Sequence, residues 1–107
     1  MKKNKAIKCG DISTEFIKTE VGQKYYGAWQ KASDVYAKMC DHHQSLYERR
    51  KNEGASKDEL DAMLDAFREE ERPAQLDVHS AFNDYKIARE CYESTMDNLG
   101  LIDWTTF

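Results

Sequence analysis

The stretch Cys40-Asp41-His42-His43 holds the side chains best suited to chemistry in this chain of 107 residues. Cys40 and His43 stand at i and i+3, on one face of a helix, where a thiolate and an imidazole could share a zinc ion. A complete zinc site needs further soft ligands, and the expected helix pairing places Glu69 opposite Cys40. We therefore predict no metal and no cofactor.

Cys40 beside His43 is also the candidate pair for nucleophilic catalysis, since such a pair needs a base within reach of the nucleophile. A helix surface offers no oxyanion donors, because its interior backbone amides are already bonded within the helix. The sequence shows no catalytic, cofactor or nucleotide motif. We expect the chain not to be an enzyme and to take no small-molecule substrate, and we interpret His43 as part of a helical seam.

That seam is a mostly apolar stripe whose members are separated by four and three residues in alternation. This spacing is typical of one face of a long helix and predicts such a helix over residues 25–50. The stripe consists of Tyr25, Trp29, Ala32, Tyr36, Met39, His43, Leu46 and Arg50. Before it, Asp11 or Ser13 is expected to begin a short helical segment, which Gly22 and Gly27 interrupt.

Gly54 lies near the midpoint of the chain and can take the left-handed conformation that ends a helix. Ser56 and Glu59 then form a capping box that begins a second helix. Apolar residues continue at helical spacing up to Gly100, which is expected to end that helix. Pro73 either kinks or breaks it, and the unchanged phase of the apolar positions favours the kink.

These signals predict an all-α fold, an elongated antiparallel two-helix hairpin with the second helix kinked or broken at Pro73. We divide the chain into a basic N-terminal arm at 1–10, a hairpin domain at 11–100 with its turn at 52–56, and an apolar C-terminal tail at 101–107. The antiparallel register places His43 near Phe67 and Tyr25 near Tyr85.

Two helices bury one stripe each, so several apolar side chains off the seam are left without a third element to cover them. They are Tyr26, Val35, Tyr47, Ile87 and Cys91. Self-association into a four-helix bundle or docking onto another protein would bury them. We expect a protein–protein interaction module, an adaptor or assembly subunit of a larger complex, whose partner is a protein or a second copy. The residues predicted to bind the partner are Tyr26, Tyr47, Tyr92, Trp104 and Phe107.

The net charge of −4 combines a lysine-rich start with an acidic body. Four carboxylates follow one helical stripe, namely Asp58, Asp61, Asp65 and Glu69. The alternative function is therefore a small acidic inhibitor or decoy that blocks a basic, nucleic-acid-binding site on a target protein. Direct binding of nucleic acid is not expected of an acidic body. A weaker alternative is a metal-responsive helical protein that uses Cys40 and His43.

No stretch reaches the roughly 20 consecutive apolar residues that a bilayer span requires, so no membrane contact is predicted. The chain has three cysteines, an odd number at spacings unlike a disulfide framework. Such cysteine usage is typical of a reducing compartment, and we predict a cytoplasmic location.

Overall fold

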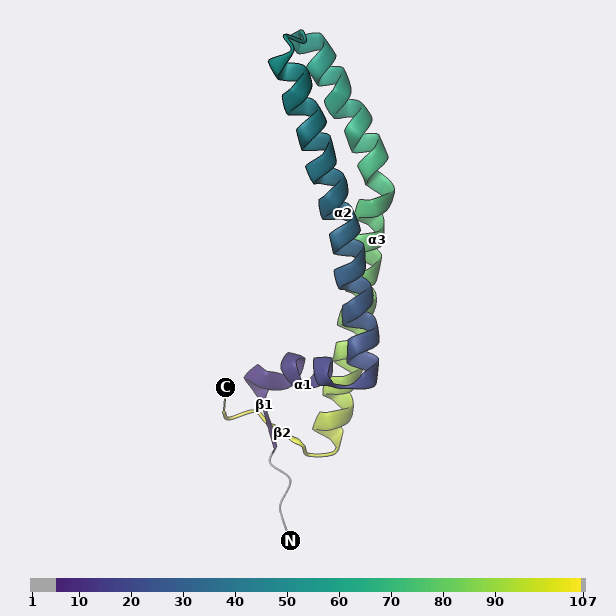
Figure 1. The fold of residues 1–107 in the computed structure, drawn as a ribbon. Coiled ribbons are helices and arrows are strands. Elements are labelled where there is room, and N and C mark those ends of the chain that lie inside the picture. The colour runs from purple at the N-terminus through teal and green to yellow at the C-terminus, as the bar shows by residue number, and fades with distance from the viewer. Residues whose placement is uncertain (1–5, 107) are drawn as a thin grey trace. The chain divides into compact units, whose positions relative to one another are not determined.

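The computed structural model describes residues 6–106, which form two long helices preceded by a short one (Figure 1). In chain order the elements are β1 (Ile7–Lys8), a 3-10 turn (Cys9–Asp11), α1 (Ile12–Lys18), α2 (Glu20–Asn52), α3 (Lys57–Asn98) and β2 (Ile102–Asp103). The predicted all-α hairpin of two long helices is confirmed, whereas the two short strands were not predicted. Within the described residues, no helix is long and apolar enough to cross a membrane.

The turn between α2 and α3 follows the chemistry expected of Gly54. This glycine has a φ of 87°, in the left-handed region that a side chain would disfavour. The backbone N–H of Ala55 donates to the carbonyl of Arg50 at 3.1 Å, and that of Gly54 donates to Lys51 at 3.1 Å. These two bonds make a Schellman end, which satisfies carbonyls that the end of α2 would otherwise leave unpaired.

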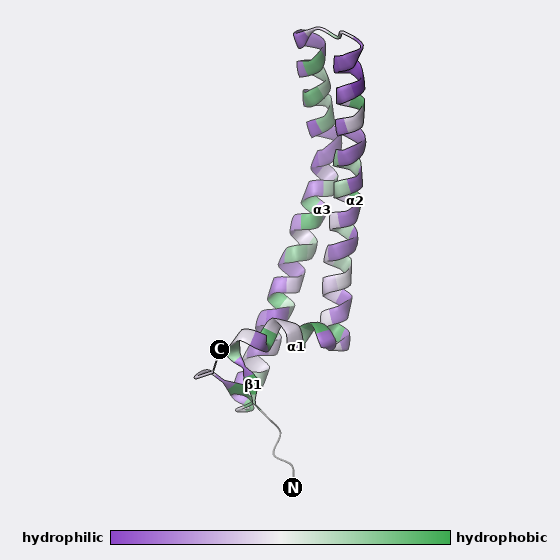
Figure 2. Cartoon of the chain, turned by 60° about the vertical axis from the view of Figure 1, so that its left-hand side comes forward, coloured by the Kyte–Doolittle hydropathy of each residue, from purple (hydrophilic) through white to green (hydrophobic). Residues whose placement is uncertain are grey.

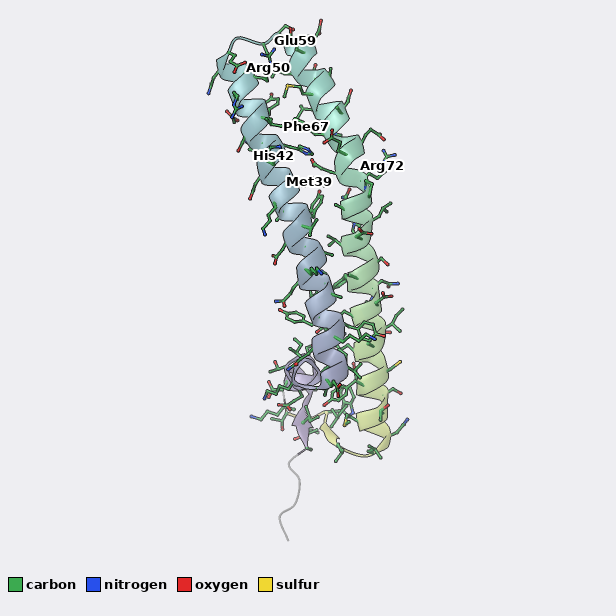
Figure 3. The ribbon with its side chains drawn as sticks, turned by 45° about the vertical axis from the view of Figure 1, so that its right-hand side comes forward. Met39, His42, Arg50, Glu59, Phe67 and Arg72 are labelled. Atoms are coloured by element: carbon green, nitrogen blue, oxygen red, sulfur yellow. The ribbon has the colours of Figure 1, made fainter. Side chains whose placement is uncertain are left out.

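Ser56 begins α3 by accepting a hydrogen bond at its Oγ from the backbone N–H of Glu59, at 3.2 Å. The carboxylate of Glu59 turns to Arg50, with 3.0 Å between the guanidinium nitrogen and the oxygen. Arg50 also pairs with Glu53 at 2.8 Å. Figure 3 shows Arg50 and Glu59 on facing ends of α2 and α3, beside the turn. The turn is thus stabilised by the hydroxyl of Ser56, which caps α3, and by Arg50, which pairs with both glutamates.

Pro73 lies inside α3, which continues through it, so the alternative of a break is wrong. A proline has no N–H to offer the carbonyl four residues earlier, here that of Glu69. The next residue, Ala74, is buried.

Hydrophobic and hydrophilic positions alternate along both long helices, as the colours of Figure 2 show.

Contacts divide the chain into two compact units, each of which contains part of α2 and part of α3. Unit 1 comprises residues 6–28 and 82–106 of the described chain, and unit 2 comprises Trp29–Ala81. Unit 1 therefore holds α1 and both strands, whereas unit 2 holds the turn. Each unit is described by itself below.

In unit 1, the boundary between α1 and α2 falls at Thr19, not at the glycines. Its Oγ1 accepts from the backbone N–H of Gly22 at 2.9 Å and donates to the carbonyl of Phe16 at 2.6 Å. A Cβ atom on Gly22 would overlap that same carbonyl oxygen. Gly22 is therefore needed for the close approach of two backbone segments, whereas Gly27 lies within α2 with open space beside it.

Phe16 is the centre of the unit 1 core, with 1% of its surface exposed. Its ring lies 5.7 Å from that of Tyr85 and 5.4 Å from that of Tyr92, between centroids. Tyr26 reaches Tyr85 as well, at 5.8 Å. The expected nearness of Tyr25 to Tyr85 stays a prediction, and α1 adds a third surface that the two-helix register did not include.

The last turn of α3 ends at Gly100, whose φ is 69°. The backbone N–H of Leu101 donates to the carbonyl of Met96 at 2.9 Å, the second Schellman end. Ile102 then pairs with Ile7 in the parallel ladder of β1 and β2, and the N–H of Ile7 donates to Leu101 at 2.7 Å. The described part of the tail therefore lies against the described part of the arm.

Candidate functional site

Unit 1 has an open groove between the first turns of α2 and the later half of α3. Its hollow has a volume of about 470 Å³. Val21 and Ile87 lie together in it, with 54% and 52% of their surfaces exposed. The residues that line this groove are Val21, Tyr25, Asp84, Ile87, Ala88 and Cys91.

The groove exists because α3 has two apolar faces in this unit. Tyr85 and Tyr92 lie on the face of α3 that contacts Phe16 of α1. Ile87 follows Tyr85 by two positions, a rotation of about 200° around a helix, and so points to the other side of α3. The short helix α1 covers one face of the pair, and the face with Ile87 stays open.

A second, smaller hollow of about 310 Å³ lies further along α3 in the same unit. Trp104, after β2, is 52% exposed and donates its indole N–H to Asp97 at 2.7 Å. Glu90, Glu93 and Ser94 complete its lining. Three carboxylates beside an exposed aromatic ring give this end of α3 an acidic, partly apolar surface.

The residues predicted to bind a partner are placed in different ways. Tyr26 and Tyr92 pack within unit 1, on Tyr85 and Phe16 respectively, so their rings are half-buried. Tyr47 is half-buried beside the hollow that contains His43 in unit 2. Trp104 is exposed, and Phe107 lies outside the described residues. The expectation that Tyr26 lacks a cover is wrong, because the three-element core of unit 1 uses it.

His43 is the buried polar side chain of unit 2, with 6% of its surface exposed. Its Nδ1 lies 3.0 Å from a carboxylate oxygen of Glu71, and its Nε2 lies 2.9 Å from one of Glu70. The ring stacks on Phe67, with centroids 4.1 Å apart and an interplanar angle of 8°. Figure 3 shows Phe67 between α2 and α3. The predicted nearness of His43 and Phe67 is confirmed.

The hydrogen bond to Glu71 raises the pKa of His43 most strongly, and the hydrogen bond to Glu70 adds to the effect, while burial opposes it. Each ring nitrogen faces a carboxylate, which in its ionised form only accepts hydrogen bonds. The arrangement therefore favours the protonated imidazolium over the neutral ring.

The Sγ atom of Cys40 lies 3.6 Å from a carboxylate oxygen of Glu71, two positions beyond Glu69, which the predicted register places opposite Cys40. Burial raises the pKa of its thiol, with a smaller opposing contribution from Tyr36. A raised pKa keeps sulfur in the thiol form, which is a poor nucleophile and a poor metal ligand. Among residues 6–106, no group of three or more metal-binding side chains comes together.

The acidic stripe of α3 lies on the exposed surface of unit 2. Asp65 pairs with Arg68 at 3.4 Å, and Glu69 pairs with Arg72 at 3.1 Å. These pairs are strongly exposed, so they offset part of the local negative charge without adding much stability. Asp58 and Asp61 occupy the first turns of the same helix.

Sequence reasoning found the open groove only in part. Ile87 and Cys91 were recognised as apolar residues without cover, but Val21 was not among the residues singled out. The signal that could have found it is Thr19 and Gly22, a cap followed by a small residue, which restarts the helix and turns Val21 outward. The pairing of His43 with two consecutive glutamates had no sequence signal, because it depends on the local register.

Comparison with family models, curated proteins and solved structures finds no match to this chain.

Proposed function

We propose that this chain is a non-enzymatic protein–protein interaction module, an adaptor or assembly subunit, and that unit 1 receives an amphipathic helix from a partner protein. The observation that carries the proposal is the open groove, in which Val21 and Ile87 are more than half exposed. Covering an aliphatic side chain of this size stabilises a complex by about 1.5–3 kcal/mol.

A helix suits this groove because both walls are helical. Val21 and Tyr25 on α2 are four residues apart, as are Ile87 and Cys91 on α3. Side chains at that spacing form parallel ridges, and the ridges of a third helix pack between them. The partner helix would complete a bundle in which α1 already covers the opposite face.

The charge of the surface indicates the chemistry of the partner. Asp84 lies within the open groove, and Glu90, six residues further along α3, lines the acidic hollow beside Trp104. A partner helix with an apolar stripe flanked by Lys or Arg would match both features. Trp104 is then a contact for such a cation, since its exposed ring can receive one by a cation–π interaction.

The alternative, an acidic decoy for a basic site, has less support. Two of its four carboxylates, Asp65 and Glu69, already pair with arginines of the same helix. The metal-responsive alternative has less still, since Cys40 and His43 both engage Glu71. The proposal includes a cytoplasmic location, in line with three cysteines that remain free.

The first experiment is sedimentation of the full chain over a concentration series, followed by binding of a designed amphipathic peptide with leucines on one face and lysines beside them. We expect a monomer that binds the peptide, with amide shifts in NMR spectra centred on Val21 and Ile87. Ile87→Glu should weaken binding by roughly 10–100-fold.

The matched control is Leu76→Glu, which changes a similarly exposed aliphatic residue of α3 in unit 2. We expect this variant to bind as the unaltered chain does. Equal binding by the Ile87 and Leu76 variants would overturn the proposal. A stable dimer that Ile87→Glu dissociates would replace the foreign helix by a second copy of this chain.

A further inference from the structure

The imidazole of His43 occupies an arrangement that only its charged form satisfies fully. A neutral ring donates from one nitrogen, and its other nitrogen has a lone pair that would face a carboxylate oxygen. Here both distances are those of hydrogen bonds, 3.0 Å to Glu71 and 2.9 Å to Glu70. The ring belongs to α2 and the carboxylates belong to α3. The hydrogen bonds of the doubly protonated ring therefore link the two helices.

We propose that His43, Glu70 and Glu71 form a pH-dependent latch that holds α2 against α3 within unit 2 when His43 is protonated and loosens when the proton leaves. This latch is independent of the open groove, which lies in unit 1. It needs no ligand, because the titrating group and both of its partners belong to the chain.

The two carboxylates have unequal roles because they differ in burial. The side chain of Glu71 is 20% exposed, whereas that of Glu70 is 65% exposed. After His43 loses a proton, its remaining N–H stays with Glu71, the less exposed of the two, because a hydrogen bond lost by a carboxylate with little access to water costs more. Glu70 can turn into water at little cost. Deprotonation therefore releases the contact with Glu70 and keeps the contact with Glu71.

Other polar groups surround the latch on both helices. Cys40 donates its thiol to Glu71 at 3.6 Å, and the ring of His42 lies 6.2 Å from that of His43. Tyr36 has a raised pKa, chiefly through its hydrogen bond with Cys40. Tyr47 and Arg68 line the same hollow, and the guanidinium of Arg68 pairs with Asp65. The two carboxylates are thus the groups that contact the ring nitrogens.

The sign of the pH effect follows from the raised pKa of His43. A histidine with a pKa higher in the folded than in the unfolded state stabilises the fold fully below the unfolded value, about 6.5. That contribution is lost as the pH rises through the folded value. The stability of unit 2 is therefore expected to fall as the pH rises above about 6.5.

The direct test is an NMR titration of the histidine rings of the full chain between pH 6 and pH 9. We expect His43 to titrate above the ordinary value of 6.5, and nitrogen shifts to show both ring nitrogens protonated below that point. Titration of His43 at or below 6.5 would overturn the latch.

Glu70→Gln tests the mechanism without removing the buried histidine. A glutamine amide can accept from a protonated Nε2 or donate to an unprotonated one, so it no longer favours the charged ring. We expect a lower pKa of His43 and a smaller difference in Tm between pH 6 and pH 9.

The matched control is Glu69→Gln, one position earlier, where the carboxylate pairs with Arg72 instead. It removes the same charge from the same turn of α3 and should leave the titration of His43 nearly unchanged. If Glu69→Gln and Glu70→Gln shift that titration equally, the effect is general charge and the latch is wrong.

Discussion

Unit 1 and unit 2 differ in the side chains that they bury where α2 packs against α3. In unit 1 the buried side chains are apolar and include Ile12, Phe16 and Ile102. In unit 2 the centre of the pair is His43, a buried polar group between two carboxylates. The difference is α1, which gives unit 1 a third surface. Where two helices have no cover, a polar cluster closes the pair instead.

The largest effect on this comparison is expected from Phe16→Ala, which removes the central side chain of the unit 1 core. Loss of a buried phenylalanine costs about 3–5 kcal/mol. Chemical denaturation should show this loss, and hydrogen exchange should place it in α1 and β1, with slow amides near His43 retained. A change below about 1 kcal/mol, or equal loss of protection in both units, would show that unit 1 has no separate core.

Two glycine variants test the close approach of the backbone at the junction between α1 and α2. Gly22→Ala should destabilise the chain by about 1–3 kcal/mol, because its Cβ overlaps the carbonyl oxygen of Phe16. Gly27→Ala, which meets open space in the same helix, should stabilise it by about 0.4–1 kcal/mol. Thermal unfolding of both variants gives the comparison. Shifts of the same sign would contradict the assigned close approach.

The smallest effect concerns the pH dependence of unit 1, which should run opposite to that of unit 2. Hydrogen bonds from Thr105, and then from Thr106, lower the pKa of Asp103 to about 2. A lowered carboxyl pKa stabilises the fold above its unfolded value of 3.8, and this contribution is lost as the pH falls through about 2. The carboxyl carbon shift of Asp103 should report this titration, and Thr105→Val should move it toward ordinary values. An unchanged midpoint in that variant would contradict the assignment.

The sequence predicted the parts of the fold that depend on local chemistry. Gly54 and Gly100 take the left-handed conformation expected of them, and Ser56 caps α3. The proximity of His43 to Phe67 followed from the antiparallel register that the turn at Gly54 sets. These features need only neighbouring residues or a repeated spacing.

The sequence did not predict what depends on contacts between distant segments. Strands β1 and β2 pair Ile7 with Ile102. Each strand has two residues, too few to show the alternating pattern that predicts a strand. Phe16 contacts the ring of Tyr92, and Tyr85 contacts the ring of Tyr26, and the periodic pattern did not indicate these pairs. The contact between Cys40 and Glu71 joins residues 31 positions apart, and no local pattern indicates it.

The pairing of β1 with β2 also has a consequence for the order of folding. Ile7 and Ile102 are 95 positions apart (102 − 7), so closing that loop in an unfolded chain costs about 4 kcal/mol of entropy. Two short strands do not offset such a cost. After Phe16 packs on Tyr92, 9 positions (16 − 7) separate Ile7 from Phe16, and 10 positions (102 − 92) separate Tyr92 from Ile102. The ladder is therefore a late event, formed on a core that already exists, and the first contact of unit 1 to open.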